Sequence, residues 1–461
     1  MRKVLMVAYY FPPIGATGAM RPLGFCRYLP QYGWAPHVVT TDTQSVYPKS
    51  PIDANLAAKV PATVKVHVVP YVSPLEKLLH LRERVRGAIG LAHKARVQLG
   101  RASMQGGAPS SAKTPTAIGM LKRFMLDRLF AFPDPQSPWM RPVLREMGRL
   151  RDEDRPDVVF ATGSPWTSMV IGRELGRRFQ VPYIVDFRDP WAMNAGFHYL
   201  SSRLIRMTEA LEREVCNEAG AVIANTEELR QHLVQQYPEI QAKCVALPNG
   251  FHADDFSGLS SVAGVHDGTD SRLELCHFGT IYMMRTPAEL LRALLELVEQ
   301  GELSKPQLIV RFVGGWDIRD PQCERMALEL EKHGVLRREP PVSHQECLKQ
   351  MSKADVLLTM QPGSTLQIPA KIYEYIATRR PLVVIGDSGA TFNLVQRHKL
   401  GVCCPNNVQA IKQLMKELIR DSGRSASPAK ESSDAFNYCN LSAQLAGILD
   451  RACGSQIRCD T

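Results

Sequence analysis

The stretch that decides the fold is Val181-Pro182-Tyr183-Ile184-Val185-Asp186-Phe187-Arg188-Asp189-Pro190-Trp191. Its apolar core predicts a buried strand of a parallel sheet, and charged residues follow where the strand ends. Ligands of open α/β sheets bind beyond the carboxyl ends of the strands. We therefore expect Asp186, Arg188 and Asp189 at a functional site. An ion pair between Arg188 and either acid would also explain these residues.

Short apolar runs alternate with helical patterns along most of the chain, as in parallel sheets covered by helices. In the first half we expect strands at Val4–Tyr10, His37–Thr41, Lys65–Val69, Asp157–Thr162, Tyr183–Phe187, Ala221–Asn225 and Cys244–Leu247. In the second half we expect them at Leu273–Phe278, Leu308–Val313, Asp355–Met360 and Pro381–Ile385. The pattern predicts an α/β protein of two doubly wound, Rossmann-like domains that face a central crevice.

Two polar stretches set the expected domain limits. The N-terminal domain should cover residues 1–253, a linker 254–272 and the C-terminal domain 273–420, and a low-complexity link with a terminal helix should fill 421–461. A length of 461 residues suits two domains.

Composition excludes several classes of protein. The hydrophobic fraction of 44% and the charged fraction of 22% are those of a globular protein. No run approaches the roughly 20 apolar residues that span a bilayer. The eleven cysteines form no Cys-x-x-Cys pair, which favours reduced thiols in the cytoplasm. Arg2-Lys3 and the apolar run after it could begin a signal peptide, but a buried first strand is the favoured interpretation.

Residues 76–128 do not fit the alternation. They hold eleven Lys or Arg and three acids, so this segment carries +8 of the formal net charge of +10. Apolar residues recur near one helical face between Leu75 and Ala95. The pattern indicates either a helix on an anionic membrane surface or a solvated insertion. No nucleic-acid-binding motif accompanies the charge.

The loop after the first expected strand contains Gly15 and Gly18, and Arg21 follows them. Such a turn lets backbone amides approach an anion at a helix start. Asp42 stands where a dinucleotide fold keeps its ribose acid, but the spacing is G-x-x-G instead of G-x-G-x-x-G. A nicotinamide-dependent oxidoreductase is therefore a weak alternative.

Two further features lie in the second half. Arg285 follows the expected strand Leu273–Phe278, and Lys371 and Glu374 stand at the start of an expected helix. A helix start that carries a cation suits a phosphate group. An exposed ion pair between residues three apart would explain Lys371 and Glu374 equally well.

Taken together, four motifs resemble a family-four retaining glycosyltransferase with the GT-B fold, in the subgroup marked by Asp-Phe-Arg-Asp-Pro-Trp. They are Phe11-Pro12-Pro13 with the glycines and arginine after it, the run 186–191, Leu247-Pro248-Asn249-Gly250-Phe251, and Lys371-x-x-Glu374-Tyr375. The resemblance extends from Met1 to about Arg420. It implies a nucleotide-sugar donor on the C-terminal domain and an acceptor on the N-terminal one.

The resemblance also assigns roles by position. Gly15, Gly18, Arg285 and Lys371 would face the donor diphosphate, Glu374 the donor ribose, Arg21 and Asp186 the acceptor, and Arg188 and Asp189 would be catalytic. Cations and helix starts stabilise a leaving diphosphate, so we expect neither a metal ion nor a cofactor. Asp152-Glu153-Asp154 matches the Asp-x-Asp of metal-dependent glycosyltransferases, but it precedes a strand and is expected to be a solvated loop.

The sequence departs from the commoner family pattern twice. Eight residues before Glu374, where the family has a second acid, stands Leu366, and Arg188 occupies the place of the usual N-domain histidine. We expect a bacterial enzyme of polysaccharide or cell-envelope synthesis, cytoplasmic or peripheral on the inner face of the membrane, that uses a lipid-linked or cell-surface glycan acceptor. A non-catalytic GT-B scaffold at the membrane is the alternative.

Overall fold

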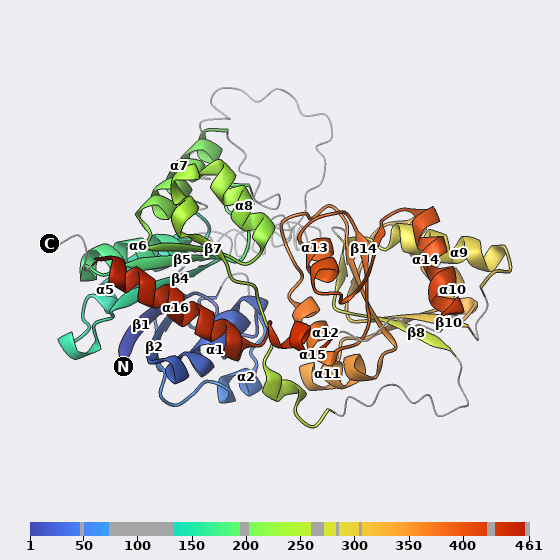
Figure 1. The fold of residues 1–461 in the computed structure, drawn as a ribbon, viewed down its shortest axis with the longest axis horizontal. Coiled ribbons are helices and arrows are strands. Elements are labelled where there is room, and N and C mark those ends of the chain that lie inside the picture. The colour runs from blue at the N-terminus through green and yellow to red at the C-terminus, as the bar shows by residue number, and fades with distance from the viewer. Residues whose placement is uncertain are drawn as a thin grey trace, which may run out of the picture. The chain divides into compact units, whose positions relative to one another are not determined.

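The computed structural model describes residues 1–46, 50–72, 132–193, 202–259, 272–282, 285–303, 307–421 and 429–456 (Figure 1). The basic segment 76–128 and most of the expected linker lie outside these residues. The chain forms two compact units, Met1–Pro248 with Leu441–Thr461, and Asn249–Asn440. The N-terminal unit thus ends at Pro248 instead of residue 253.

The last helix, expected in a terminal piece of its own, belongs mainly to the N-terminal unit. It is α16 (Tyr438–Gln456), and from Leu441 onward it packs with residues before Pro248. Trp34 Nε1 donates to Asp450 at 3.1 Å, and Arg2 pairs with the same carboxylate. The first residues of the helix belong to the C-terminal unit, where the ring of Tyr438 lies 5.0 Å from that of His252.

Seven parallel strands form the sheet of the N-terminal unit, in the order β3-β2-β1-β4-β5-β6-β7 (Figure 1). They are β1 (Arg2–Ala8), β2 (Trp34–Thr40), β3 (Lys65–Val68), β4 (Val158–Gly163), β5 (Tyr183–Phe187), β6 (Ala221–Ala224) and β7 (Cys244–Ala246). All seven expected strands are present. The central place of β1 confirms that the first apolar run is a buried strand.

Helices cover both faces of this sheet because successive strand residues point to opposite sides. Leu5 and Val7 of β1 belong to a core that contains residues of α5 (Met140–Met147), α6 (Thr167–Phe179), α7 (Ser202–Glu218) and α8 (Glu227–Gln236). Met6 points the other way and contacts Cys26 of α1 (Met20–Tyr28). Phe25 of the same helix meets Phe160 of β4, with ring centroids 5.9 Å apart.

The C-terminal unit has a six-stranded parallel sheet in the order β12-β10-β8-β13-β14-β15. Its strands are β8 (Leu273–Phe278), β10 (Leu308–Val313), β12 (Leu336–Glu339), β13 (Val356–Gln361), β14 (Leu382–Gly386) and β15 (Gly401–Pro405). β9 (Ile281–Tyr282) and β11 (Trp316–Asp317) pair with each other in a separate two-stranded sheet. The four strands expected from the sequence are present, and the edge strands β12 and β15 were not expected.

This sheet is also covered on both faces. Leu273 and Leu275 of β8 share a core with α9 (Ala288–Glu299), α10 (Pro321–Lys332) and α14 (Val408–Arg420). Cys276 and Phe278 share the opposite core with α11 (His344–Lys353), α12 (Lys371–Thr378) and α13 (Ala390–Arg397). Both units are therefore doubly wound, as expected. Among the described helices, none has the length and apolarity needed to cross a bilayer.

Candidate functional site

A glycine, Gly279, directly follows the carboxyl end of β8. Its φ is +139°, in the region that favours glycine. After the neighbouring strand β10, a Cβ on Gly314 would lie 2.2 Å from the Gly279 carbonyl oxygen, so the two backbones touch here. Only residues without side chains allow this contact. The two glycines therefore let the chain segments that follow β8 and β10 pack directly on each other.

The charges of two cations expected from the sequence act on one buried ring at this end of β8. The ring is that of His277 in β8, and its pKa is lowered to about 4, first by burial and then by the charges of Arg285 and Lys371. Arg285 also stands over the ring of Tyr282, 5.4 Å from its centroid. The fold thus brings together two cations that are far apart in sequence. No sequence pattern had singled out His277.

Lys371 and Glu374 form an ion pair at the start of α12, with Nζ 3.2 Å from Oε2. The other carboxylate oxygen, Oε1, is 3.0 Å from Nε2 of His344, the first residue of α11. Burial raises the pKa of Glu374, but the His344 hydrogen bond and the Lys371 charge outweigh it and hold the pKa below its usual value. Glu374 is therefore a carboxylate at neutral pH, held in place by two elements of the unit.

Of the two N-terminal glycines, Gly15 commits its amide to the fold. Gly15 donates its N–H to the Pro51 carbonyl at 2.7 Å, so this group is not available to a phosphate. Gly18 instead uses its carbonyl, which accepts from Arg188 Nη1 at 2.6 Å. A Cβ on Gly18 would lie 2.3 Å from that nitrogen, which explains why a glycine stands there. In this structure the Gly15 amide therefore cannot contact a diphosphate, and the assignment of the loop of Gly15 and Gly18 to the donor diphosphate stays a prediction.

Arg21 and Asp186 form a buried ion pair with each other. Arg21 Nε donates to both carboxylate oxygens, at 3.1 and 2.9 Å, and Nη2 to Oδ1 at 2.7 Å. Arg21 is 2% and Asp186 0% exposed. Arg21 also donates to the carbonyls of Leu247 and Pro248, at 2.9 and 2.6 Å. Neither side chain reaches solvent, so contact with an acceptor is not their role in this structure. Asp186 pairs with Arg21, and not with Arg188, which was one of the two ion pairs that the sequence allowed.

Arg188 ties two loops together. Its guanidinium donates to the backbone carbonyls of Gly18, Gly163 and Ser164, the last two at the end of β4. Burial lowers its pKa, and the charges of Asp189 and Asp186 oppose that effect. Arg188 and Asp189 are both half-buried. Arg188 is therefore at least a residue that positions the Gly18 loop, and a catalytic role is still a prediction.

Paired measurements on Arg188→Ala and Asp189→Asn separate these roles. Arg188→Ala removes three hydrogen bonds, so we expect the unfolding free energy to fall by about 2 kcal/mol and turnover to fall with it. Asp189→Asn keeps the shape of the side chain and should lower turnover at least tenfold while Tm stays within about 2 °C. Melting curves and turnover of both variants test this. A proportionate loss of Tm and turnover in Asp189→Asn would mean that the acid is structural.

Glu212 of α7 is a buried acid that hydrogen-bonds the loop after β5. It is 3% exposed and accepts from the Ala192 backbone N–H at 3.1 Å and from the Tyr237 hydroxyl at 3.2 Å. Burial raises its pKa to about 7, although both hydrogen bonds act in the other direction. No sequence pattern pointed to this acid, because it lies inside an ordinary amphipathic helix.

Glu212→Gln is expected to stabilise the protein at high pH. Burial raises the folded-state pKa of the acid to about 7, above the unfolded value of 4.5. The folded state thus binds the proton more tightly, and stability falls as pH rises from about 4.5 to above 7. Glutamine avoids this penalty of about 3 kcal/mol and can keep both hydrogen bonds. Tm should therefore rise at pH 8 and hardly change at pH 4.5; an equal shift at both would contradict the raised pKa.

Other residues noted in the sequence serve the fold. Asp42 accepts from the Ser45 backbone N–H at 2.7 Å in a turn, which leaves the oxidoreductase alternative without a distinctive feature. Asp152-Glu153-Asp154 is a short 3-10 helix before β4, where the acids pair with surface cations, so the expectation of a solvated loop is confirmed. Within the described residues no three His, Cys, Asp or Glu side chains gather as a metal site. Metal independence stays a prediction.

Comparison of the fold places the chain in a known class. It has the GT-B fold of two Rossmann-like units. Anabaena HepE in complex with UDP and glucose aligns with a TM-score of 0.62 at 14% identity, over 98% of this chain and 100% of that one. Sucrose-phosphate synthase from Thermosynechococcus elongatus aligns with a TM-score of 0.61 at 13% identity, over 100% of each chain. At such identities the likeness is one of fold alone.

Sequence comparison adds a family match in the N-terminal unit. Residues 110–250 match the model of the glycosyl transferase 4-like domain. The D-inositol 3-phosphate glycosyltransferase of Kineococcus radiotolerans is 27% identical over 182 residues, which cover 38% of this chain and 42% of the relative. The match thus spans less than half the length of that relative.

Proposed function

We propose that this chain is a retaining glycosyltransferase that moves a sugar from a nucleotide-sugar donor to a lipid-linked or cell-surface glycan. The observation that carries the proposal is the charged cluster at the start of α12, where Lys371 pairs with Glu374 at 3.2 Å, together with the charges of Lys371 and Arg285 that both act on His277. The glycosyl transferase 4-like match and the fold shared with UDP-bound HepE support it. Donor binding is assigned to the C-terminal unit and acceptor binding to the N-terminal unit.

The chemistry of the cation pair fits a leaving nucleoside diphosphate. Negative charge grows on the diphosphate as its bond to the sugar breaks. Fixed cations attract this charge and so lower the energy of the transition state. Arg285 offers a planar guanidinium with several donors, and Lys371 a point charge. Glu374, held as a carboxylate, can accept from the two ribose hydroxyls. These groups provide the stabilisation without a metal ion, so we propose that activity persists in a chelator.

The proposal is tested by incubating the full chain with UDP-, GDP- and TDP-sugars and following release of the diphosphate, with and without EDTA. Turnover of one donor supports it, and the anomeric signals of the product in a proton NMR spectrum decide between retention and inversion. Lys349→Ala is a matched control, because Lys349 is an exposed cation on α11. Binding of a nucleotide sugar without hydrolysis or transfer would favour the non-catalytic scaffold.

We also propose that residues 76–128, with their charge of +8, dock the chain on an anionic membrane surface. Each well-placed Lys or Arg contributes about 1 kcal/mol at low salt, so four or five of them would give reversible recruitment. Co-sedimentation with liposomes, with and without anionic lipid and at low and high salt, tests this. Binding that ignores lipid charge, or that survives deletion of 76–128, would identify a solvated insertion.

A further inference from the structure

His277 is a buried histidine with one ring nitrogen committed and the other available. Nδ1 lies 3.0 Å from the Leu358 carbonyl oxygen of β13, and the side chain is 3% exposed. A carbonyl oxygen only accepts, so Nδ1 must carry the hydrogen. The neutral ring then has its lone pair on Nε2. In the described part of the chain Nε2 has no hydrogen-bond partner.

His277 Nε2 lies near Gly279, at the carboxyl end of β8. A Cβ on Gly279 would lie 3.7 Å from it, so the nitrogen stands beside the one residue of that turn that has no side chain to cover it. Phe312 of β10 packs on the ring, with centroids 5.8 Å apart. The Leu358 hydrogen bond and this packing fix the ring. Nε2 is therefore a fixed, neutral acceptor next to two cations.

The kind of group that can bind Nε2 follows from its protonation. Phosphate oxygens at the Arg285 and Lys371 site are acceptors and cannot donate to a lone pair. His277 is also a poor general base, because a nitrogen with a pKa of about 4 takes up a proton poorly at neutral pH. The group must be a neutral donor such as a hydroxyl. On the proposed ligand, hydroxyls are present on the ribose, which Glu374 is placed to bind, and on the transferred sugar.

We propose that His277 Nε2 accepts a hydrogen bond from a hydroxyl of the donor's transferred sugar and so contributes to the choice of that sugar. This inference rests on the proposed function. His277 is then a specificity-determining residue of the C-terminal unit. Burial, helped by the charges of Arg285 and Lys371, lowers the pKa of the ring and keeps Nε2 unprotonated at physiological pH.

Two variants separate the structural nitrogen from the proposed one. In His277→Asn the side-chain amide can still donate to the Leu358 carbonyl, as Nδ1 does, but nothing replaces Nε2. In His277→Gln the longer amide returns an acceptor near the position of Nε2. The probes are the UDP-, GDP- or TDP-sugar that raises the Tm of the wild-type chain most, and the matching nucleoside diphosphate, which lacks the transferred sugar.

Titration calorimetry should show that His277→Asn binds the nucleotide sugar about tenfold more weakly while its affinity for the diphosphate changes less than about twofold. His277→Gln should recover most of the loss. An equal loss for both ligands would overturn the inference, since it would assign Nε2 to the ribose or to the fold. Unchanged affinity for both would overturn it too.

A second measurement keeps the test valid if His277→Asn does not fold. Deoxy forms of the same donor, each lacking one sugar hydroxyl, are titrated into the wild-type chain and into His277→Gln. One deoxy donor should bind the wild type about tenfold more weakly than the parent donor. If every deoxy donor binds as the parent does, the inference is wrong. If the wild-type chain binds neither a nucleotide sugar nor a diphosphate, the proposed function fails first, and the two failures are distinct.

Discussion

Replacing Arg21 with methionine is expected to lower the unfolding free energy of the N-terminal unit by about 3–5 kcal/mol, because it leaves Asp186 buried without its cation. The Thr162 hydroxyl, which donates to Oδ2 at 2.7 Å, would remain a hydrogen-bond donor to that carboxylate, and the charge of Arg188 would offset part of its charge. The carbonyls of Leu247 and Pro248 would also lose a donor. For a unit of this size the loss corresponds to a Tm lower by roughly 6–20 °C. Asp186→Asn should have a similar effect, since it leaves Arg21 uncompensated.

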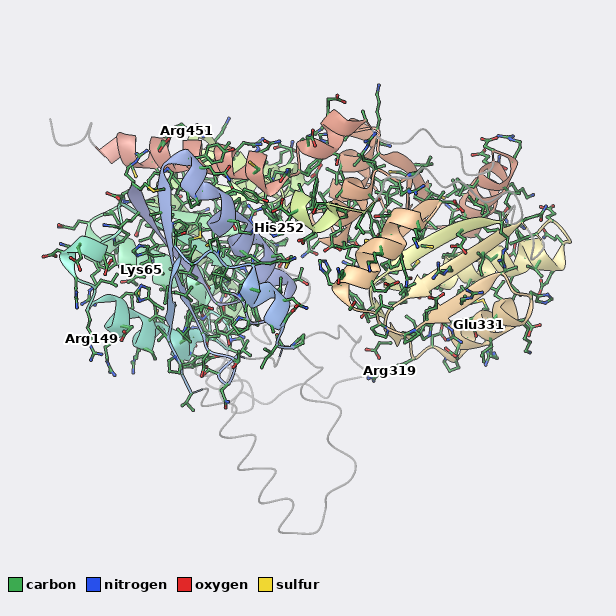
Figure 2. All side chains as sticks on the ribbon, turned by 90° about the horizontal axis from the view of Figure 1, so that it is seen from below. Lys65, Arg149, His252, Arg319, Glu331 and Arg451 are labelled. Carbon is green, nitrogen blue, oxygen red and sulfur yellow. The ribbon has the colours of Figure 1, made fainter. Side chains whose placement is uncertain are left out.

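A double variant and an exposed control make this prediction specific. Arg21→Met with Asp186→Leu removes both charges, so its loss should be smaller than the sum of the single losses by at least about 2 kcal/mol. Arg149→Met is the control, because Arg149 is 71% exposed and its pair with Glu146 spans 3.6 Å (Figure 2). It should change stability by less than about 0.5 kcal/mol. An Arg21→Met variant within about 1 kcal/mol of the wild type would contradict the buried ion pair.

The alternation of apolar runs and helical patterns predicted the two sheets because most of their strands are buried on both faces. β12 was not predicted because only its first residue is buried, and its sequence Leu-Arg-Arg-Glu is typical of a polar loop. The structure shows why those charges are tolerated in a strand at the edge of the sheet. Arg338 pairs with Glu324 and Glu331, and Glu339 pairs with Arg311. A short strand whose charges find partners in other elements leaves no periodic signal.

Some residues of the candidate site were likewise predictable from the sequence, and others were not. Lys371 and Glu374 were predicted because residues three apart on a helix share a face. His344 and His277 were not, since one precedes them in another helix and the other lies within a strand, and only tertiary packing brings them to the site. Arg21 is the opposite case. Its position suggested a ligand contact, but its burial against Asp186 shows that a charged residue directly after a glycine-containing loop can belong to the core.

Glu374→Gln and Lys371→Ala are each expected to lower turnover about 30- to 1000-fold, or about 2–4 kcal/mol of transition-state stabilisation. The loss arises because each removes a charge assigned to the donor, the ribose acid in one case and a diphosphate cation in the other. Tm should change little, since Lys371 is 37% exposed on its side chain and solvent screens the pair. Turnover of the best donor and melting curves of the same samples provide the two readings.

The other explanation, a plain surface ion pair, makes the opposite prediction. Lys332 and Glu329 of α10 are also three residues apart, with Nζ and Oε2 separated by 2.9 Å and side chains 74% and 44% exposed. Lys332→Ala therefore removes the same kind of pair from the same unit and should leave turnover unchanged. What sets Lys371 and Glu374 apart is their surroundings, because His344 contacts Glu374 and the charge of Lys371 acts on the buried His277 ring. If the Lys371 and Glu374 variants behave like Lys332→Ala, their assignment to the diphosphate and the ribose is wrong.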